Sequence, residues 1–434
     1  MIRYLSAGRL TALTEKIQAC LECSRKNGNL VPAKEGSGNH IIDSWFQQEE
    51  MRKTKHRSSG NRTLLVLGAG ASIGAAKYPI ESSLREAMAK MPSSENFFHD
   101  LFFQGKTDTH GKGYLNVLGL TSEGVNYLIV RAWALKNNLK HFDPDEWRQI
   151  NIEEVFTFLD IGERMYPQGT RYQRGFRTCK RELEAFITSF LSVKSEGFHC
   201  EHLMHILFAL EPTDSIISFN WDTIADFTLQ QTGLPPYAGY LDLMTAEPLR
   251  VSDFVHRGVL LKLHGSLNWI VCPNPQCALH GKIRLAVRNQ KLLRFFEMHK
   301  CPECGNDRAE PFIVPPTSQK LIRGGTVLHK LWLLAREQLQ YCRRIIFIGY
   351  SFPTTDFYSE WLFRQIYFLQ GSLPEIIVVN PAIMKTESTT AKRYEKIFRG
   401  CRIHKFATLE SFRNKGLGLL KTDDKEPTTG SKVP

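Results

Sequence analysis

The feature that most constrains the fold is a series of short apolar segments separated by longer stretches of chain. The first opens at Thr63, and the others lie at residues 215–223, 260–266, 343–353 and 375–381, with 401–407 as a weaker candidate. Such runs are typical of strands buried on both faces of a parallel sheet. Helical patterns lie between several of them, and this alternation predicts an α/β fold with a doubly wound, Rossmann-like parallel sheet.

Polar residues stand where three of these predicted strands end. They are Asn220 and Asp222, then His264 and Ser266, then Tyr350, Ser351 and Asp356. The carboxyl ends of parallel strands share one edge of the sheet, where open α/β sheets bind ligands. Each residue also has a structural explanation, since Asn and Asp cap helices, strand-end histidines are often only hydrogen-bonded, and Tyr and Asp beside a Pro can belong to a turn. Their convergence nevertheless predicts a site at this edge.

A glycine-rich turn, Gly68-Ala69-Gly70, follows the first predicted strand and precedes a helical pattern. Glycines here allow a pyrophosphate to approach the backbone and the start of the helix. With Gly74 the spacing is G-x-G-x-x-x-G, which by itself also fits a turn that merely closes a strand onto a helix. Residues 75–80 are expected to form a loop over the glycines.

Four cysteines form a candidate metal module. Cys272 and Cys277 are separated by four residues, and Cys301 and Cys304 by two. Four thiolates suit a closed, tetrahedral Zn²⁺ site of the structural kind, which leaves no position for a catalytic water. Two histidines, at 280 and 299, are possible substitutes for Cys277. Cys20 and Cys23 lie on a helical pattern with no second pair nearby, and we expect them to be ordinary helix residues.

Composition sets the remaining bounds. The net charge of +12 invites a nucleic-acid partner, but the basic residues are scattered, so a solvated surface is favoured and nucleic-acid binding stays open. No apolar run approaches the roughly 20 residues of a transmembrane helix. Ten cysteines in 434 residues are too few for a disulfide scaffold. These features predict a cytoplasmic protein without a membrane partner.

The pattern along the chain predicts five parts. They are an N-terminal helical arm with a basic linker (1–62), the first part of the core (63–270) with a helical insertion at about 92–212, the zinc module (271–310), the rest of the core (311–420) and a disordered tail (421–434). Within the insertion, "GVNYLIVRAWALKNNL", "IEEVFTFLDIGERM" and "RELEAFITSFLSV" carry apolar residues at helical spacing.

Five motifs, in order, carry a resemblance to a known family. "GAGAS" (68–72), "SFNWD" (218–222), "LHGSL" (263–267) directly before the four cysteines, "IGYSF" (348–352) and "VVNP" (378–381) resemble the motifs of a sirtuin (silent information regulator) NAD-binding domain over roughly residues 63–407. "KYPIESSL" and "PFIVPPTSQK" stand where sirtuin deacylases carry an Asp-Phe-Arg segment and an acyl-lysine groove. In these two departures, and in its "NIEEVF" helix start, the chain is similar to divergent bacterial sirtuin-like domains that cleave NAD in antiphage defence.

The resemblance implies a role for each motif residue. Asn220 would hold the nicotinamide ribose and position the attacking water, Asp222 would orient the carboxamide or ribose, and His264 would be the general base. The turn residues Gly68, Ala69, Gly70 and Ser72 would bind pyrophosphate, and Gly349, Ser351 and Asn380 would contact the adenosine side. The resemblance also implies a structural Zn²⁺ at the four cysteines. The implied activity is an NAD glycohydrolase that yields nicotinamide and ADP-ribose, acting as a regulated effector of antiphage defence through NAD depletion.

Two other functions stay open at this point. A protein deacylase or ADP-ribosyltransferase would consume NAD only with a protein substrate, and the departures from the acyl-lysine groove argue against it. A non-catalytic NAD or ADP-ribose sensor would bind the nucleotide without consuming it, and the presence of Asn220 and His264 argues against that. A partner protein that triggers or inhibits activity, and a homo-oligomer, are further expectations from the resemblance.

Overall fold

The computed structural model describes the central part of the chain. The described residues are 62–76, 152–177, 201–272, 274–280, 282–288, 291–292, 301, 303–305, 310–314, 326–353 and 356–420, with single positions at 180, 184, 188 and 191. All of them belong to one unit of the chain, Asn61–Pro434. The expected N-terminal arm, the helix over "GVNYLIVRAWALKNNL" and the C-terminal tail lie outside the described residues.

Six parallel strands form the main sheet. In sheet order they are β11 (Ile403–Phe406), β10 (Glu375–Val379), β9 (Cys342–Ile348), β1 (Arg62–Leu67), β2 (Ser215–Ser218) and β3 (Leu260–Lys262). Every neighbouring pair is parallel. The order starts at β1, runs outward through β2 and β3, and then restarts at β9 on the other side of β1, as in a doubly wound Rossmann sheet. The predicted fold class is confirmed, and the weaker strand candidate is the edge strand β11.

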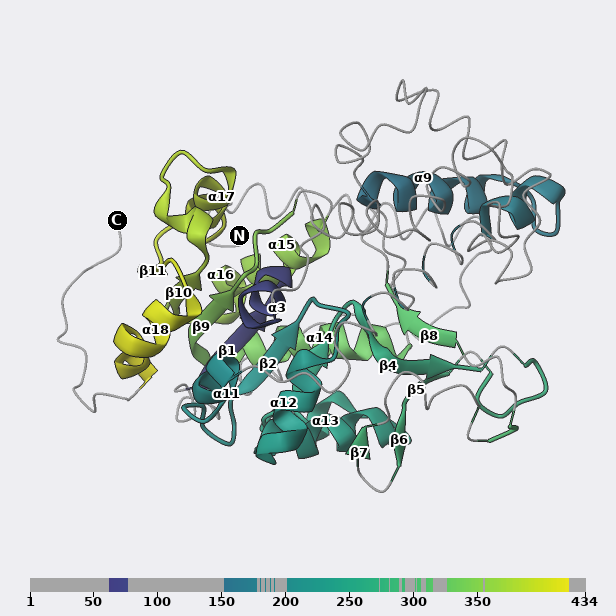
Figure 1. The fold of residues 1–434 in the computed structure, drawn as a ribbon, viewed down its shortest axis with the longest axis horizontal. Coiled ribbons are helices and arrows are strands. Elements are labelled where there is room, and N and C mark those ends of the chain that lie inside the picture. The colour runs from purple at the N-terminus through teal and green to yellow at the C-terminus, as the bar shows by residue number, and fades with distance from the viewer. Residues whose placement is uncertain are drawn as a thin grey trace, which may run out of the picture. The chain divides into compact units, whose positions relative to one another are not determined.

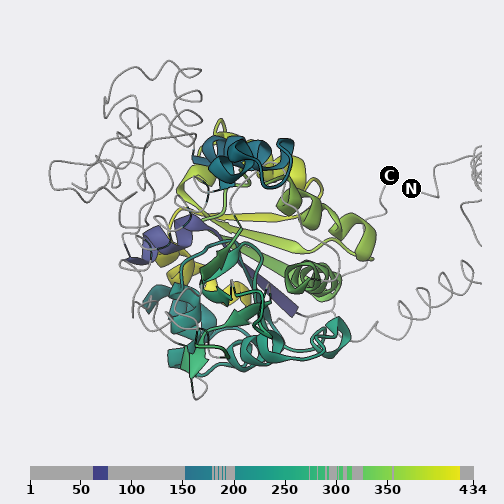
Figure 2. The same ribbon diagram turned by 90° about the vertical axis from the view of Figure 1, so that its right-hand side faces the viewer.

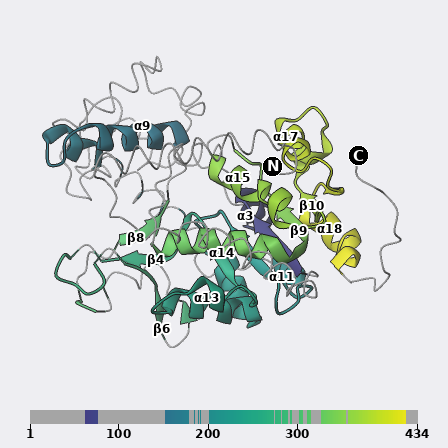
Figure 3. The ribbon, with the colours of Figure 1, turned by 180° about the vertical axis from the view of Figure 1, so that it is seen from behind.

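Helices cover both faces of this sheet (Figures 1 and 3). One face carries α3 (Ala69–Ala76), α11 (Glu201–Leu207), α12 (Ile224–Thr232) and α18 (Leu409–Lys415), and the other carries α14 (Val327–Tyr341), α15 (Phe357–Arg364) and α16 (Ile366–Leu369). The central strands are buried on both faces, as in Leu65 and Ile346, which are 0% exposed. This double burial is why the strands are continuously apolar rather than alternating.

Three more helices and three 3₁₀ turns lie among the described residues. They are α9 (Ile152–Met165), α13 (Pro235–Thr245), α17 (Thr389–Ile397), and the 3₁₀ turns η3 (Val251–Asp253), η5 (Pro381–Met384) and η6 (Leu417–Leu420). Helix α9 coincides with the predicted helix "IEEVFTFLDIGERM", and its Phe156 and Leu159 are buried. Helix α13 packs against β3 and covers that edge of the sheet.

A second, smaller sheet carries the cysteine module. It is antiparallel and consists of β5 (Ile283–Leu285), β4 (Gly265–Val271) and β8 (Glu310–Ile313), with a separate hairpin of β6 (Val287–Arg288) and β7 (Lys291–Leu292). This sheet lies at the right of the main sheet in Figure 1 and therefore on the side that faces the viewer in Figure 2.

Two local predictions need correction. The run at 260–266 was expected to be one strand, but β3 ends at Lys262 and β4 begins in the other sheet at Gly265, whose φ of +77° turns the chain. Both halves are buried, so hydrophobicity alone did not mark the break. The loop expected at 75–80 is also wrong at its start, because α3 continues to Ala76; the rest of that loop lies outside the described residues.

Asp214 lies just before β2, at the amino end of the sheet. Its carboxylate accepts hydrogen bonds from the backbone N–H groups of Thr63 (2.7 Å) and Glu211 (2.8 Å). Burial nevertheless raises the pKa of Asp214 to about 6. A carboxyl group whose folded-state pKa lies above its unfolded value favours folding below the unfolded pKa, and this contribution is lost as the pH rises through the folded value.

We therefore expect stability to depend on pH through Asp214. A difference of about two pKa units corresponds to about 3 kcal/mol, so the parent should lose about that much stability relative to Asp214→Asn between about pH 4 and about pH 7. Urea unfolding at several pH values measures this difference. Asn carries no charge at any of these pH values, so the loss of a hydrogen bond in this variant changes its free energy of unfolding by the same amount at every pH. A constant difference across this range would contradict the prediction.

Candidate functional site

The glycine turn after β1 packs directly against the end of β9. The Gly68 N–H donates to Ile348 O and the Gly70 N–H to Gly349 O, both at 2.9 Å. A Cβ on Gly68 would lie 2.6 Å from Gly349 O, and one on Gly70 would lie 2.7 Å from Gly349 Cα. The missing side chains therefore let two backbones meet where the strand order reverses, which is where doubly wound sheets bind ligands. Ala69 is the exposed residue of this turn.

Gly349 is the residue of this contact that tolerates a side chain least. Its φ is +62°, and a Cβ would lie 2.2 Å from both Gly70 C and Ala71 N. We expect Gly349→Ala to reduce the free energy of unfolding by about 2–4 kcal/mol, because backbone strain adds to the collision. Gly371→Ala is the matched control, since a Cβ there meets nothing within 4 Å. Equal urea midpoints for the two variants would contradict this assignment.

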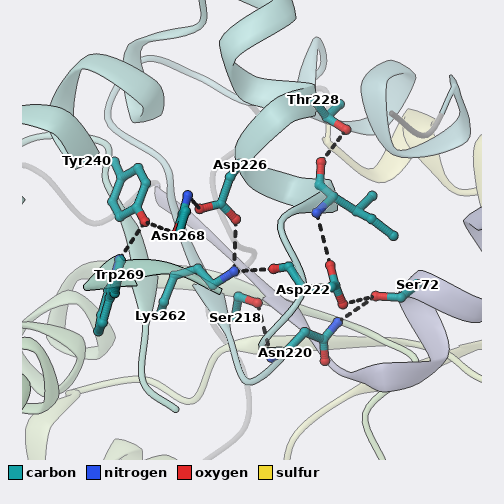
Figure 4. A network of polar contacts seen from close by, with 11 residues as sticks. Ser72, Ser218, Asn220, Asp222, Asp226, Thr228, Tyr240, Lys262, Asn268 and Trp269 are labelled. Carbon is teal, nitrogen blue, oxygen red and sulfur yellow. Dashed lines mark hydrogen bonds and ion pairs between the residues drawn. The ribbon is translucent and has the colours of Figure 1, made fainter. Parts of the chain in front are cut away.

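Asn220, Ser72 and Asp222 form a buried polar cluster at the same edge (Figure 4). The Asn220 amide nitrogen donates to Gly68 O (2.8 Å) and to Ser72 Oγ (3.0 Å). Ser72 Oγ in turn donates to Asp222 Oδ2 at 2.6 Å. The two amide hydrogens of Asn220 are thus directed at Gly68 and Ser72, and its amide oxygen remains as an acceptor. The cluster joins β2 to the turn between β1 and α3.

Asp222 stabilises the start of a helix and also has the environment of a functional carboxyl group. Its Oδ1 accepts the Ile224 N–H at 3.0 Å and so caps the start of α12, as the structural alternative expects. Its Oδ2 is the atom bound by Ser72. Burial raises the pKa of Asp222, while the positive charge of Lys262 and the Ser72 hydrogen bond lower it. Asp222 is therefore a desolvated carboxyl group, which makes it a candidate for a functional role.

His264 lies in the turn between β3 and β4, close to this cluster. Its ring meets the edge of the Phe219 ring at 5.0 Å between centroids, and Phe219 directly precedes Asn220. The backbone holds the two segments together, because the Leu263 N–H donates to Ser218 O (3.1 Å) and the Leu267 N–H to Trp221 O (2.9 Å). The break between β3 and β4 is thus what places His264 beside the Asn220 turn.

Asp356 faces His264 from the start of α15. Its Oδ2 lies 3.3 Å from His264 Nε2, and the two side chains are 2% and 9% exposed. The Tyr350 hydroxyl donates to the same oxygen at 2.7 Å, and Oδ1 accepts the Ser359 N–H at 3.4 Å. Tyr350 also stacks on Phe219 at 4.6 Å. The sequence places Tyr350 and Asp356 at this edge, but no motif assigns either of them a catalytic or binding role.

Ser351 and Asn380, the other residues predicted on the adenosine side, follow the carboxyl ends of two neighbouring strands. Ser351 is exposed just after Tyr350. Asn380 follows β10, and its side chain accepts the Ala382 N–H at 2.9 Å, which caps η5. Its amide also donates to Tyr350 O at 3.4 Å. Both residues therefore lie after the carboxyl ends of β9 and β10, at the predicted edge, and Asn380 has a structural role there.

The four cysteines converge as predicted. Their sulfur atoms all lie within 4.8 Å of one another, with Cys272 Sγ 3.6 Å from Cys304 Sγ and Cys277 Sγ 3.7 Å from Cys301 Sγ. A tetrahedral Zn²⁺ with Zn–S bonds of about 2.3 Å requires sulfur separations of about 3.8 Å. The Leu279 N–H donates to Cys277 Sγ at 3.3 Å, as expected for a ligand thiolate. The cluster fits a four-coordinate metal ion.

One proposed substitute ligand has a different role, and the other cannot be placed. His280 Nδ1 lies 3.2 Å from the backbone oxygen of Cys272 and is not part of the cluster of ligand atoms. His299 lies outside the described residues.

Among the described residues, no helix combines the length and the apolar character needed to cross a bilayer.

Comparison with known proteins finds similarity to solved structures. No family model matches the chain, and no curated protein matches it. The chain is similar to a solved structure of Sir2 in complex with the inhibitor EX-527, 2′-O-acetyl-ADP-ribose and a deacetylated p53 peptide. The two share 12% identity, the match covers 86% of this chain and 98% of that one, and the TM-score is 0.31.

Proposed function

We propose that this protein is an NAD glycohydrolase that cleaves NAD to nicotinamide and ADP-ribose. The observation that carries the proposal is the buried Asn220–Ser72–Asp222 cluster at the point where the strand order of the sheet reverses, with His264 packed against Phe219, the residue before Asn220. This is the place where a doubly wound sheet receives a dinucleotide. The cluster supplies an amide, a desolvated carboxyl group and an imidazole, which are the groups that hydrolysis of a glycosidic bond requires.

The chemistry follows from the charge on the substrate. Hydrolysis breaks the bond between ribose C1′ and the nicotinamide ring nitrogen, and the electron pair returns to that nitrogen and removes its positive charge. The transition state resembles an oxocarbenium ion, which a nearby carboxylate stabilises. Asp222 is the carboxyl group available for this in the cluster. Its second oxygen, which binds Ser72, keeps it oriented toward the turn of Gly68.

Water completes the reaction. The amide oxygen of Asn220 accepts a hydrogen bond from the water that attacks C1′, and His264 takes the proton that the water loses. The products are nicotinamide, ADP-ribose and one proton, so atoms and charge balance. Asp356 supports this step, because a carboxylate 3.3 Å from the imidazole stabilises its protonated form. Imidazole suits the role because it titrates near neutral pH.

The experiment that tests this function is the release of nicotinamide from NAD by the purified full chain, without a protein substrate. We expect nicotinamide and ADP-ribose in equal amounts. Turnover that requires an added acylated or acceptor protein would favour a deacylase or ADP-ribosyltransferase instead. Binding of NAD without turnover, with and without candidate activators, would favour a sensor.

The biological role that we propose is that of a regulated effector of antiphage defence, which acts by depleting NAD. It rests on the sequence motifs and on the proposed activity. Expression of the chain in bacteria should then lower cellular NAD when the enzyme is triggered by infection, and a variant without hydrolase activity should leave NAD unchanged. NAD levels that stay constant through infection would contradict this role.

A further inference from the structure

Lys262 is a buried cation that the proposed reaction does not use directly. It is the last residue of β3, and its side chain is 0% exposed. Its ammonium group lies 2.8 Å from Asp226 Oδ2, and Asp226 is also 0% exposed. The same ammonium donates to the backbone oxygen of Asp222. Removing both charges from water costs several kcal/mol per ion, which only well-formed partner interactions offset.

The pair belongs to a network that reaches from α12 to β4 (Figure 4). The Asn268 amide nitrogen donates to Asp226 Oδ1 at 2.9 Å, the Tyr240 hydroxyl to Asn268 Oδ1 at 3.4 Å, and Trp269 Nε1 to the Tyr240 hydroxyl at 2.7 Å. In the described part of the chain, Ser266 Oγ is the only buried side-chain polar atom without a partner. Each buried side-chain polar atom of the network around Lys262 therefore has at least one hydrogen-bond partner, which favours a single arrangement.

The charges of the network act on Asp222. The ammonium group of Lys262 contacts the Asp226 carboxylate and acts on the Asp222 carboxyl group through its charge. The Asp222 carboxyl group is itself contacted by the Ser72 hydroxyl and the Ile224 N–H. Burial raises the pKa of Asp222, and the charge of Asp226 raises it further. The charge of Lys262 lowers this pKa, and its effect is larger than that of Asp226. Without this cation, a carboxyl group so deeply buried would tend to take up a proton.

We propose that Lys262 is a positioning residue, which fixes the Asn220–Asp222 turn through the Asp222 backbone oxygen and supplies the positive charge opposite the Asp222 carboxylate. The proposal rests on the proposed hydrolase function. A pair of apolar side chains could fill the same space at no greater cost in stability. Only a cation at this position can both hold the carbonyl oxygen of the turn and keep the neighbouring carboxyl group charged.

The test uses Lys262→Met combined with Asp226→Asn. This double variant removes both charges of the Lys262–Asp226 pair, so neither partner is left as an unpaired charge, and the new amide at position 226 still offers an oxygen to Asn268. Lys330→Met is the matched control. Lys330 lies on α14, and its ammonium group also donates to a backbone oxygen, that of Leu249, at 3.0 Å. Thermal unfolding of the variants establishes that each is folded.

The decisive measurement is the ionisation of Asp222 itself. In protein labelled with ¹³C-aspartate, the carboxyl resonance of Asp222 is identified by its loss in Asp222→Asn. We expect its titration midpoint to rise in the double variant, because the lost effect of Lys262 on the Asp222 pKa is larger than that of Asp226, and to stay unchanged in the Lys330 control. An unchanged midpoint in the folded double variant would overturn the proposal.

Activity gives the second measurement. In the double variant we expect nicotinamide release at neutral pH to fall by about tenfold or more, with the acidic limb of the pH–rate profile displaced to higher pH by the same amount as the Asp222 midpoint. A purely structural role for Lys262 would lower activity without moving this limb. If the parent protein releases no nicotinamide either with or without candidate activators, the proposed function fails, whereas the Asp222 midpoint still decides whether Lys262 controls that carboxyl group.

Discussion

Nicotinamide release should fall by at least about 100-fold in both Asn220→Ala and His264→Ala, because removal of a general base or of the group that positions its water typically costs that much. The two residues act on the same water, so the double variant should be little slower than either single variant. Initial rates at saturating NAD, with nicotinamide separated from substrate, measure this effect. The loss should appear in kcat, since both residues act on the transition state rather than on binding alone.

Two controls separate chemistry from folding. Asn414→Ala and His205→Ala remove the same residue types from exposed positions on α18 and α11, and both should retain full activity. Asn220→Ala also loses the hydrogen bonds to Gly68 and Ser72, so its thermal unfolding and its affinity for NAD must be measured as well. If both site variants are folded and release nicotinamide at the parent rate, hydrolysis at this site is excluded.

The sheet and its ligand edge could be predicted because strand burial leaves a direct trace in the sequence. Segments such as "IIVV" (376–379) are apolar throughout, since both faces of β10 are covered, and the strand ends are marked by polar residues or by glycine. The cysteine module could be predicted for a similar reason. Metal ligands come in close local pairs, so spacing alone indicates the cluster that the structure forms.

The break after Lys262 could not be read in this way. Leu260 and Trp269 are both 0% exposed although they belong to different sheets, so the apolar run continues across the turn. The signal that was present is Gly265, whose positive φ permits the change of direction. Without that turn, His264 would be an ordinary strand residue; with it, the imidazole faces Phe219 and Asp356.

The partners of buried polar residues were also beyond sequence reasoning. Lys262 stands inside an apolar run, and the groups that satisfy it come from α12 and the turn before it, while Asn268 of β4 completes the network. The contact between His264 and Asp356 joins residues 92 positions apart in the sequence, counted from 264 to 356. Such pairs depend on strand order and on the packing of helices, which a single sequence does not specify.

Removal of the metal that we expect at the cysteine module should destabilise the site as well as the module. Cys272 directly follows β4, and β4 pairs with β8 from Gly265 opposite Ile313 to Val271 opposite Glu310. The Val314 N–H, just beyond β8, donates to His264 O at 2.8 Å. Loosening the cysteine loop therefore loosens the strand pairing that holds His264.

We accordingly expect one equivalent of zinc per chain, and we expect Cys301→Ser to lose most of it. Structural zinc sites contribute about 10 kcal/mol or more of apparent binding free energy, so this variant, or chelation of the parent, should lower the unfolding temperature markedly and abolish nicotinamide release. Cys401→Ser is the control, since Cys401 lies outside the cluster. Metal analysis, calorimetry and the rate assay measure the three effects. Full stability and activity in zinc-free protein would show that the four thiols hold the β4–β8 connection without a metal.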